Sequence, residues 1–477
     1  MKLTTRITQA IFNIRQALIV MALTLSSNVN AAPPSITIGT SNLNYTENMP
    51  LTQFDPVATL SDSDGDTDWD GGSLVVQITA NSESSDEISI PDNVVGTINT
   101  SGFNIQNNAT VIGTLSSSEG TVTNGTALTI TFNASATNVL VQQVLQGISY
   151  RNLSDDPSAS DRTVTFTATD KIAESANDTQ TIVFTALNDQ PTLSVTADNP
   201  TFTEGDSAVS VFSNSSTSTV ESGQTLSALT LTIMNVNDGS PTGADETLSI
   251  DGSAILLTNN NSGTTTSNSL TYDVSFSGVT AMLSLTAGSL SETELQSLID
   301  NITYINSSEA PNESNRVITL TKLVDSGSNS GGNVNSTSLA LTSTITMNSV
   351  NDEPTITIES ALTTDEDNNQ SLTFTFTDVD GDTVSASLTT QADHGVASVS
   401  GTTVTYAPDA NFNGSDSFTL TLTDGAGYTT TQVISVTVNS VNDVPIITID
   451  STLTTDEDNN QSLTFTFTDV DGDTVSA

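Results

Sequence analysis

Apolar and polar residues alternate along much of this chain. Leu372, Phe374 and Phe376 are separated by threonines, and the same two-residue period recurs over residues 418–422 and 434–438. A strand that buries one face produces this pattern. Many such runs, separated by Gly, Asn and Asp, are typical of β-sandwiches. High net charge and modest hydrophobicity favour disorder, but the alternation predicts an ordered all-β chain.

One segment is copied within the chain. The 33 residues that begin at Pro354 recur 91 residues later, from Pro445, with three substitutions. A repeat of this period fits a small domain better than one turn of a solenoid. The second copy stops at Ala477, before the strands that would complete its sheets. This predicts that the chain is a fragment of a longer protein.

Three segments of the form Asn-Asp-x-Pro divide the chain, at residues 188–191, 351–354 and 442–445. Each one ends an alternating run and begins another. Proline fixes the backbone, so we expect short, stiff junctions. They predict four parts, which are unit 1 (32–189), unit 2 (190–352), unit 3 (353–443) and a truncated copy of unit 3 (444–477).

Units 1 and 2 share a second pattern. Tyr150 and Arg162 in unit 1 correspond to Tyr304 and Arg316 in unit 2, at one offset of 154 residues. No other reactive side chains gather with them. The pattern therefore predicts structural roles, with a packed ring and an ion pair at the edge of the core.

Short helical turns are expected in the first two units. Ser291 and Glu294 have the spacing of a capping box, in which each side chain bonds the other's backbone amide. Residues 138–146 are the counterpart in unit 1. The fold class predicted is thus all-β, as tandem β-sandwiches with short helical turns in units 1 and 2.

The first 31 residues have the order of regions found in a signal peptide. Lys2, Arg6 and Arg15 precede a short apolar core at residues 17–25, and small residues allow cleavage after Ala31. The core is too short for a stable membrane anchor, and no other span follows. We expect a secreted or cell-surface protein.

The net charge of the chain limits which classes of partner it can bind. Removal of residues 1–31 leaves 55 acidic and five basic residues, a net charge of −50. Nucleic acid is excluded as a partner, because a phosphate-binding face needs clustered Lys and Arg. Anionic membranes are disfavoured for the same reason. The chain has no cysteine, so no disulfide framework stabilises it.

The sequence offers little evidence for a catalytic site. His394 is the single histidine, and a lone loop histidine is more often solvated than catalytic. Carboxylates are so abundant that any pair of them is weak evidence for glycoside hydrolysis. The sequence predicts a protein that is not an enzyme.

The acidic residues lie at strand ends. Unit 3 carries 12 acids between residues 354 and 443 and no Lys or Arg. Charges this dense repel one another. A hard cation with six to eight oxygen ligands would resolve the conflict, and carboxylates without thiols or imidazoles favour Ca²⁺ over zinc or copper.

These repeats resemble the cadherin-like domains of large bacterial surface proteins. The resemblance implies tandem immunoglobulin-like or cadherin-like sandwiches of Greek-key type. The resemblance implies calcium at the junctions, held by a Glu near the first strand, an Asp-x-Asp turn, a strand-end Asp and the Asn-Asp linker. For the junction of units 2 and 3 it implies Glu204, Asn351, Asp352, Asp378, Asp380 and Asp424. After unit 3 it implies Glu366, Asn442, Asp443, Asp469 and Asp471. Between units 1 and 2 it implies Glu47, Asn188, Asp189 and Asp325, while Asp62, Asp64 and Asp170 would face whatever precedes unit 1.

The linkers depart from the animal cadherin pattern. They lack the acid two residues before the Asn, where Ala186, Ser349 and Ser440 stand, and they are one residue shorter before the proline. We expect fewer ions per junction and weak affinity, about 10⁻⁴–10⁻³ M. Residues 66–71 match half of an EF-hand loop, but Gln77 replaces the final Glu, so an acidic turn able to bind calcium is expected there.

The leading hypothesis is a calcium-stiffened extracellular stalk or adhesin of a bacterial surface or secreted protein. Its partners would be neighbouring repeats and another surface protein or a glycan. The alternatives are an array of glycan-binding modules or the accessory repeats of a carbohydrate-active enzyme. Glycan binding usually needs exposed aromatic side chains, and Trp69 is the single tryptophan.

Overall fold

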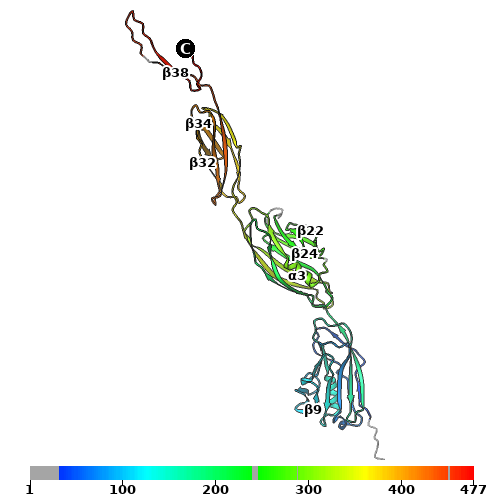
Figure 1. Cartoon of the computed structure of the whole chain (residues 1–477). Helices are drawn as coiled ribbons and strands as arrows, with labels where there is room; N and C mark the ends of the chain where they lie inside the picture. Colours follow the sequence, from blue (N-terminus) through cyan, green and yellow to red (C-terminus); the bar gives the residue numbers. More distant parts are fainter. Residues whose placement is uncertain (1–31, 239–244, 287, 450–451, 477) are drawn as a thin grey trace, which may run out of the picture.

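The computed structural model describes residues 32–238, 245–286, 288–449 and 452–476. The predicted signal peptide, residues 1–31, lies outside this range. Figure 1 shows three β-rich bodies and a terminal two-stranded segment following one another along a rod. Among the residues described, no helix has the length and apolar composition needed to cross a bilayer.

The unit 1 body is a sandwich with one large sheet. Its eight strands neighbour one another in the order β2 (Leu43–Thr46), β14 (Ser175–Thr185), β13 (Arg162–Thr169), β5 (Ser73–Ala80), β11 (Leu128–Phe132), β9 (Thr110–Leu115), β8 (Asn104–Asn107) and β7 (Ile98–Ser101). The facing strands are β10 (Thr121–Thr123), β6 (Asp86–Ser89), β12 (Ser149–Asn152) and β3 (Thr52–Gln53), with the pair β1 (Ser35–Thr37) and β4 (Thr59–Ser61) beside them. Two short 3-10 helices, η1 (Asp66–Trp69) and η2 (Ser118–Gly120), connect strands.

The unit 2 body repeats this plan. Its seven-stranded sheet runs β16 (Thr201–Thr203), β27 (Ser336–Asn348), β26 (Arg316–Asp325), β19 (Leu226–Met234), β24 (Thr280–Thr286), β23 (Thr271–Ser277) and β22 (Asn261–Thr264). The facing strands are β17 (Val209–Ser210), β25 (Thr303–Asn306), β20 (Glu246–Ile250) and β21 (Ser253–Leu256), with the pair β15 (Thr192–Ala197) and β18 (Phe212–Ser218).

The predicted helical turns are confirmed. Helix α2 (Asn138–Gly147) begins after Thr137, whose side chain accepts the amide of Leu140. Helix α3 (Glu292–Asp300) has the predicted capping box between Ser291 and Glu294. Each helix leads directly into the strand that carries the tyrosine shared by the two units, which is Tyr150 in β12 and Tyr304 in β25.

The unit 3 body is smaller. One sheet runs β29 (Ala361–Asp365), β36 (Thr429–Asn439), β35 (Gly414–Thr423) and β32 (Ser385–Thr390). The facing strands are β30 (Gln370–Thr373), β34 (Thr403–Pro408) and β33 (Gly395–Ser400), with the pair β28 (Thr355–Thr357) and β31 (Thr375–Thr377). This division of strands is that of an immunoglobulin-type sandwich. The last copy forms only the exposed pair β37 (Ile446–Ile449) and β38 (Phe465–Thr468).

Each body buries its own apolar cluster. The buried side chains run from Ile36 to Phe184, from Phe202 to Met347 and from Leu362 to Val438. The alternating residues predicted as strand interiors, such as Phe418, Leu420 and Leu422, are almost fully buried. The two-residue period identified these inner faces correctly, whereas in the run 372–376 only Phe374 is buried and Phe376 is exposed, because the run divides into β30 and β31 of different sheets.

An early strand and the last strand of each body run parallel. The pairs are β2 with β14, β16 with β27, and β29 with β36. In register, Thr46 faces Thr185, Thr203 faces Asn348, and Asp365 faces Asn439. The residue that follows the early strand therefore lies beside the linker that leaves the body. That residue is a glutamate in all three cases.

The paired Tyr and Arg form a buried polar network in both larger bodies. In unit 2, Arg316 is fully buried, its Nε lies 2.9 Å from Glu246, and it also bonds Asp238. The hydroxyl of Tyr304 donates to Glu246 at 2.7 Å. In unit 1 the same places are taken by Arg162, Asp86 and Tyr150, with Glu83 lying 2.8 Å from Arg162. The predicted structural role is confirmed.

Removing this arginine tests the network. We expect Arg316→Met to lower the free energy of unfolding by about 3–5 kcal/mol, because Asp238 and Glu246 would stay buried without a counter-charge. Lys322→Met is the matched control, since Lys322 lies on the same strand but is exposed; its effect should stay within about 0.5 kcal/mol. Urea unfolding of the whole chain measures both. Equal midpoints for the two variants would contradict the assignment.

Candidate metal centres at the unit junctions

A glutamate anchors the start of each linker. Its carboxylate accepts the backbone amide of the residue just before the linker Asn. The bonds join Glu47 to Leu187 at 2.7 Å, Glu204 to Val350 at 2.9 Å and Glu366 to Val441 at 2.6 Å. The parallel strand pairs explain the recurrence, because they place glutamate and linker side by side. One carboxylate oxygen is used in this bond and the other is left for a second partner.

A turn acid in the next body receives the linker two residues before its proline. Backbone amides donate from Asp189 to Glu221 at 2.6 Å, from Asp352 to Asp380 at 2.8 Å and from Asp443 to Asp471 at 2.6 Å. At the start of unit 1, Ala32 donates to Asp64 in the same way at 2.7 Å. Glu221 was not among the ligands predicted from the sequence. Register of β15 with β18 and of β28 with β31 aligns it with Asp380.

An aspartate at a strand end forms the third element. Asp170, Asp325 and Asp424 each accept backbone amides of their own turn, at 2.6 to 2.9 Å. The side-chain amide of Asn351 donates to Asp424 at 2.8 Å, and that of Asn188 lies 3.5 Å from Asp325. The linker asparagine therefore ties the linker to the following body. Asn442 donates only to the carbonyl of Asp443, at 2.9 Å.

At the junction of units 2 and 3, hydrogen bonds join Asn351 to Asp424 and Asp352 to Asp380. Carboxylate oxygens of Glu204, Glu309 and Asp352 lie within 4.8 Å of one another. Burial raises the pKa of Glu204, and the charges of Asp352 and Asp380 raise it further. Glu309 was not predicted, because it reaches the junction from the facing sheet, on the loop after β25. Its counterpart after β12 is Asp155.

The junction of units 1 and 2 is the most buried. Glu47, Glu221 and Asp325 are each less than a tenth exposed. Burial raises the pKa of Glu47 to about 7, with smaller contributions from the charges of Asp189, Glu221 and Asp155. Burial also raises the pKa values of Asp189 and Asp325. Ionising these groups together is therefore unfavourable without a cation.

The same junction is also held by protein contacts. The loop between β26 and β27 clasps Asn188, whose amide donates to Asn333 at 2.6 Å and whose carbonyl accepts Val334 at 2.7 Å. Gln224 bonds the side-chain oxygen of Asn188, so that oxygen is already engaged. Ser222 of unit 2 donates to Asp156 of unit 1 at 3.1 Å. The corresponding loop of unit 3, between β35 and β36, is shorter.

The outer face of unit 1 gathers Asp62, Asp64 and Asp68, whose carboxylate oxygens lie within 4.8 Å of one another. The charge of Asp170 also acts on Asp62. The segment compared with an EF-hand loop is a 3-10 turn that buries Trp69 and supplies Asp68. At the opposite end, the charges of Asp471, Asp367, Glu366 and Asp469 raise the pKa of Asp443, after burial as the main cause.

Buried carboxylate oxygens are left without partners at these places. Among the residues described, seven such oxygens make no hydrogen bond, and all seven lie on the junction faces: Glu47 Oε1, Asp62 Oδ2, Glu221 Oε2, Asp325 Oδ2, Asp352 Oδ2, Asp378 Oδ2 and Asp443 Oδ2. A buried polar atom without a partner costs about 1–3 kcal/mol, and more when it is charged. Oxygen donors of this kind fit a hard cation that needs many oxygen ligands.

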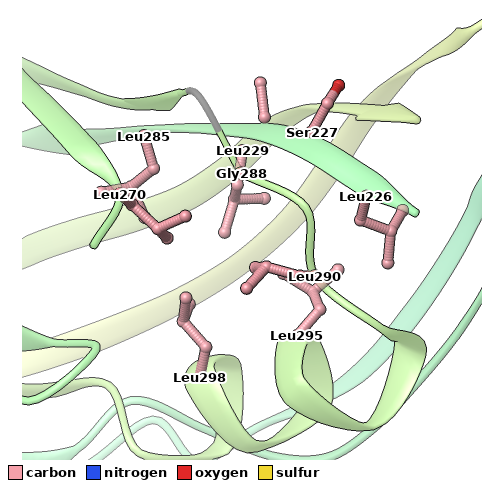
Figure 2. A pocket seen from close by; sticks show the side chains of 10 residues that line it. Leu226, Ser227, Leu229, Leu270, Leu285, Gly288, Leu290, Leu295 and Leu298 are labelled. Carbon is pink, nitrogen blue, oxygen red and sulfur yellow. The ribbon is translucent and has the colours of Figure 1, made fainter. Parts of the chain in front are cut away.

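The pocket, histidine and tryptophan that the structure describes do not offer a comparable catalytic or glycan-binding site. Figure 2 shows a pocket beneath α3 whose ten lining residues include seven leucines and no titratable side chain. His394 is exposed and its ring stacks on Phe412 at 4.2 Å. Trp69 is fully buried, so the only tryptophan offers no platform for a sugar ring. Neither a catalytic group nor an aromatic glycan surface is placed by these residues.

Comparison with known proteins agrees with this architecture. Residues 351–437, within unit 3 and its linker, match the family model described as a bacterial Ig domain. No curated protein gives a significant match to the chain. The chain is a tandem array of immunoglobulin-like β-sandwiches.

Solved structures similar to this chain include cadherin ectodomains. Extracellular cadherin domains 1–5 of Protocadherin Gamma B2 share 14% identity and a TM-score of 0.33, over 87% of this chain and 62% of that one. Mouse Cadherin-23 EC22-24 shares 12% identity and a TM-score of 0.28, over 86% of this chain and 99% of that one. The array thus spans less than two thirds of the protocadherin fragment.

The pH dependence of stability tests the raised pKa of Glu47. Its pKa is about 7 in the folded chain and 4.5 when unperturbed, so between these values the folded chain binds more protons than the unfolded one. In chelator, stability should therefore fall as pH rises from about 5 to about 8. Glu47→Gln should flatten this dependence, measured by calorimetry, while the exposed mid-strand variant Asp273→Asn should not. A dependence unchanged in Glu47→Gln would refute the assignment.

Proposed function

We propose that this array is a calcium-stiffened extracellular segment, a stalk or adhesin, of a bacterial surface or secreted protein. The observation that carries the proposal is the set of seven unpartnered, buried carboxylate oxygens at the junction faces. Calcium takes six to eight oxygen ligands at flexible geometry, which suits carboxylates that come from separate segments. The predicted signal peptide supports export.

The proposed mechanism is mechanical and electrostatic. At the junction of units 2 and 3, Glu204 and Glu309 belong to one body, Asp352 to the linker, and Asp378 and Asp380 to the next body. Calcium bound among them would fix three segments that otherwise repel one another. The angle between neighbouring bodies would then depend on calcium, while each sandwich core would not. The immediate partners in this mechanism are the neighbouring repeats themselves.

Adhesion remains part of the proposal through the array's extended form. Three bodies in a row (Figure 1) hold their far ends apart, which suits a spacer between a cell and a surface protein or glycan. The proposed function involves no turnover.

Replacing two turn acids tests the calcium junction. With calcium, the wild-type chain should melt at a higher temperature and scatter as a longer particle than in chelator. Asp378→Asn with Asp380→Asn should lose part of both gains, because two carboxylates of one junction are gone, while far-ultraviolet circular dichroism stays unchanged. Asp273→Asn, an exposed acid within β23, is the matched control. The same melting temperature and length with calcium and chelator would reject the proposal.

The clasp predicts that the two internal junctions respond unequally. Since the chain has no cysteine, spin labels can be placed at Gln77→Cys with Thr271→Cys, and at Thr271→Cys with Ser387→Cys. In chelator, the first distance distribution should stay narrow and the second should broaden, because protein contacts alone hold Asn188. Adding Asn333→Ala should broaden the first. Equal broadening of both distance distributions in the labelled chain that keeps Asn333 would contradict this account.

A further inference from the structure

The outer face of unit 1 differs from the other junction faces in carrying a base. Lys171 lies beside it, with its Nζ 2.8 Å from Asp68 and 3.3 Å from the carbonyl of Thr67. The other four bases after residue 31 are engaged elsewhere or lie mid-strand: Arg151, Arg162, Arg316 and Lys322. The acidic faces between units hold no Lys or Arg of their own. One end of the array is therefore partly neutralised by its own sequence.

Cleavage of the predicted signal peptide during export would add a second positive charge to this face. The nitrogen of Ala32 lies 2.7 Å from Asp64 Oδ2, at the position that Asp189 and Asp352 occupy in the internal linkers. In those linkers the donor is a neutral peptide amide. Hydrolysis of the Ala31–Ala32 bond adds the water oxygen to the Ala31 carboxyl group and leaves the amine on Ala32. An α-amino group has a pKa of about 7.7–8.0 and is largely protonated at neutral pH.

We propose that the outer face of unit 1 is a binding site for the chain's own processed amino terminus, whose α-ammonium and Lys171 together close the array as a cap. The proposal rests on the proposed export of the protein. It extends the junction scheme by assigning a different ligand to this one face. Four carboxylates, Asp62, Asp64, Asp68 and Asp170, would share two covalently attached cations.

The geometry offers the new donors acceptors. A peptide amide has one N–H, whereas an ammonium group has three. Asp62 is 4% exposed and its Oδ2 has no partner. Carboxylate oxygens of Asp62 and Asp68 lie within 4.8 Å of one of Asp64, which the Ala32 nitrogen already contacts. The Asp62 carboxylate is thus close to where the extra N–H groups would be.

A cap of this kind has a definite consequence. With two cations already present, this face should bind a metal ion more weakly than the same face without them. It should therefore not recruit calcium as the internal junctions do, and the outer end would not join to the end of another array through shared calcium. Terminal repeats of tandem proteins commonly need such altered outer faces.

Trp69 provides a local probe of this face, because it lies in η1 beside Asp68. Terbium, a calcium substitute, should show tryptophan-sensitised emission only when it binds near this residue. The test compares the chain that begins at Ala32 with the same chain preceded by Gly-Ser, each with Lys171 or Lys171→Gln. We expect terbium binding to become at least about tenfold tighter for each cation removed or displaced, because like charges about 4 Å apart repel strongly at a protein surface.

Controls separate this inference from the proposed function. Lys322→Gln should leave terbium emission unchanged, and Asp64→Asn should abolish the difference between the Ala32 and Gly-Ser chains. Equal terbium affinity in those two chains would overturn the proposal, as would mass spectrometry showing that the exported protein does not begin at Ala32. The calcium-dependent melting shift abolished by Asp378→Asn and Asp380→Asn is an independent measurement, so either idea can fail alone.

Discussion

Carboxylates that are held close together and away from water repel one another, and this repulsion governs the joints of the array. Glu47, Glu221 and Asp325 are nearly buried, yet each keeps an oxygen without a hydrogen-bond partner. A sandwich core could be built without such groups. Their position at the places where bodies meet makes the bodies' mutual arrangement sensitive to ions, whereas the apolar cores are built from other residues.

The fold supplies the precision that these joints need. A parallel pairing of an early strand with the last strand brings a glutamate beside each departing linker. The turn acid and the strand-end aspartate of the next body then receive the linker from the other side. All of these positions lie at the ends of rigid strands, so the acidic groups have fixed places before any ion binds. Preorganisation of this kind lowers the cost of ordering on binding.

Much of this was predictable from local pattern. The alternation identified the strands, the Ser291–Glu294 spacing identified α3, and the offset of Tyr150 and Tyr304 indicated a shared buried network. Residues such as Glu221 and Glu309 were missed for physical reasons. Glu221 stands in a turn that lacks the Asp-x-Asp form, and Glu309 reaches its junction only through the packing of the facing sheet. The clasp around Asn188 comes from a Gly-, Ser- and Asn-rich loop, which by composition looks like an ordinary connection.

The parallel pairs described for the three bodies have a consequence for tension. If the chain is pulled from its two ends, the early strand and the last strand of a body are drawn in opposite directions along their shared length. Hydrogen bonds between strands lie across that direction, so they are loaded together in shear and must break nearly at once. Opening them one by one, as when a hairpin is peeled apart, would need less force. A body clamped in this way transmits load from one joint to the next without unravelling first.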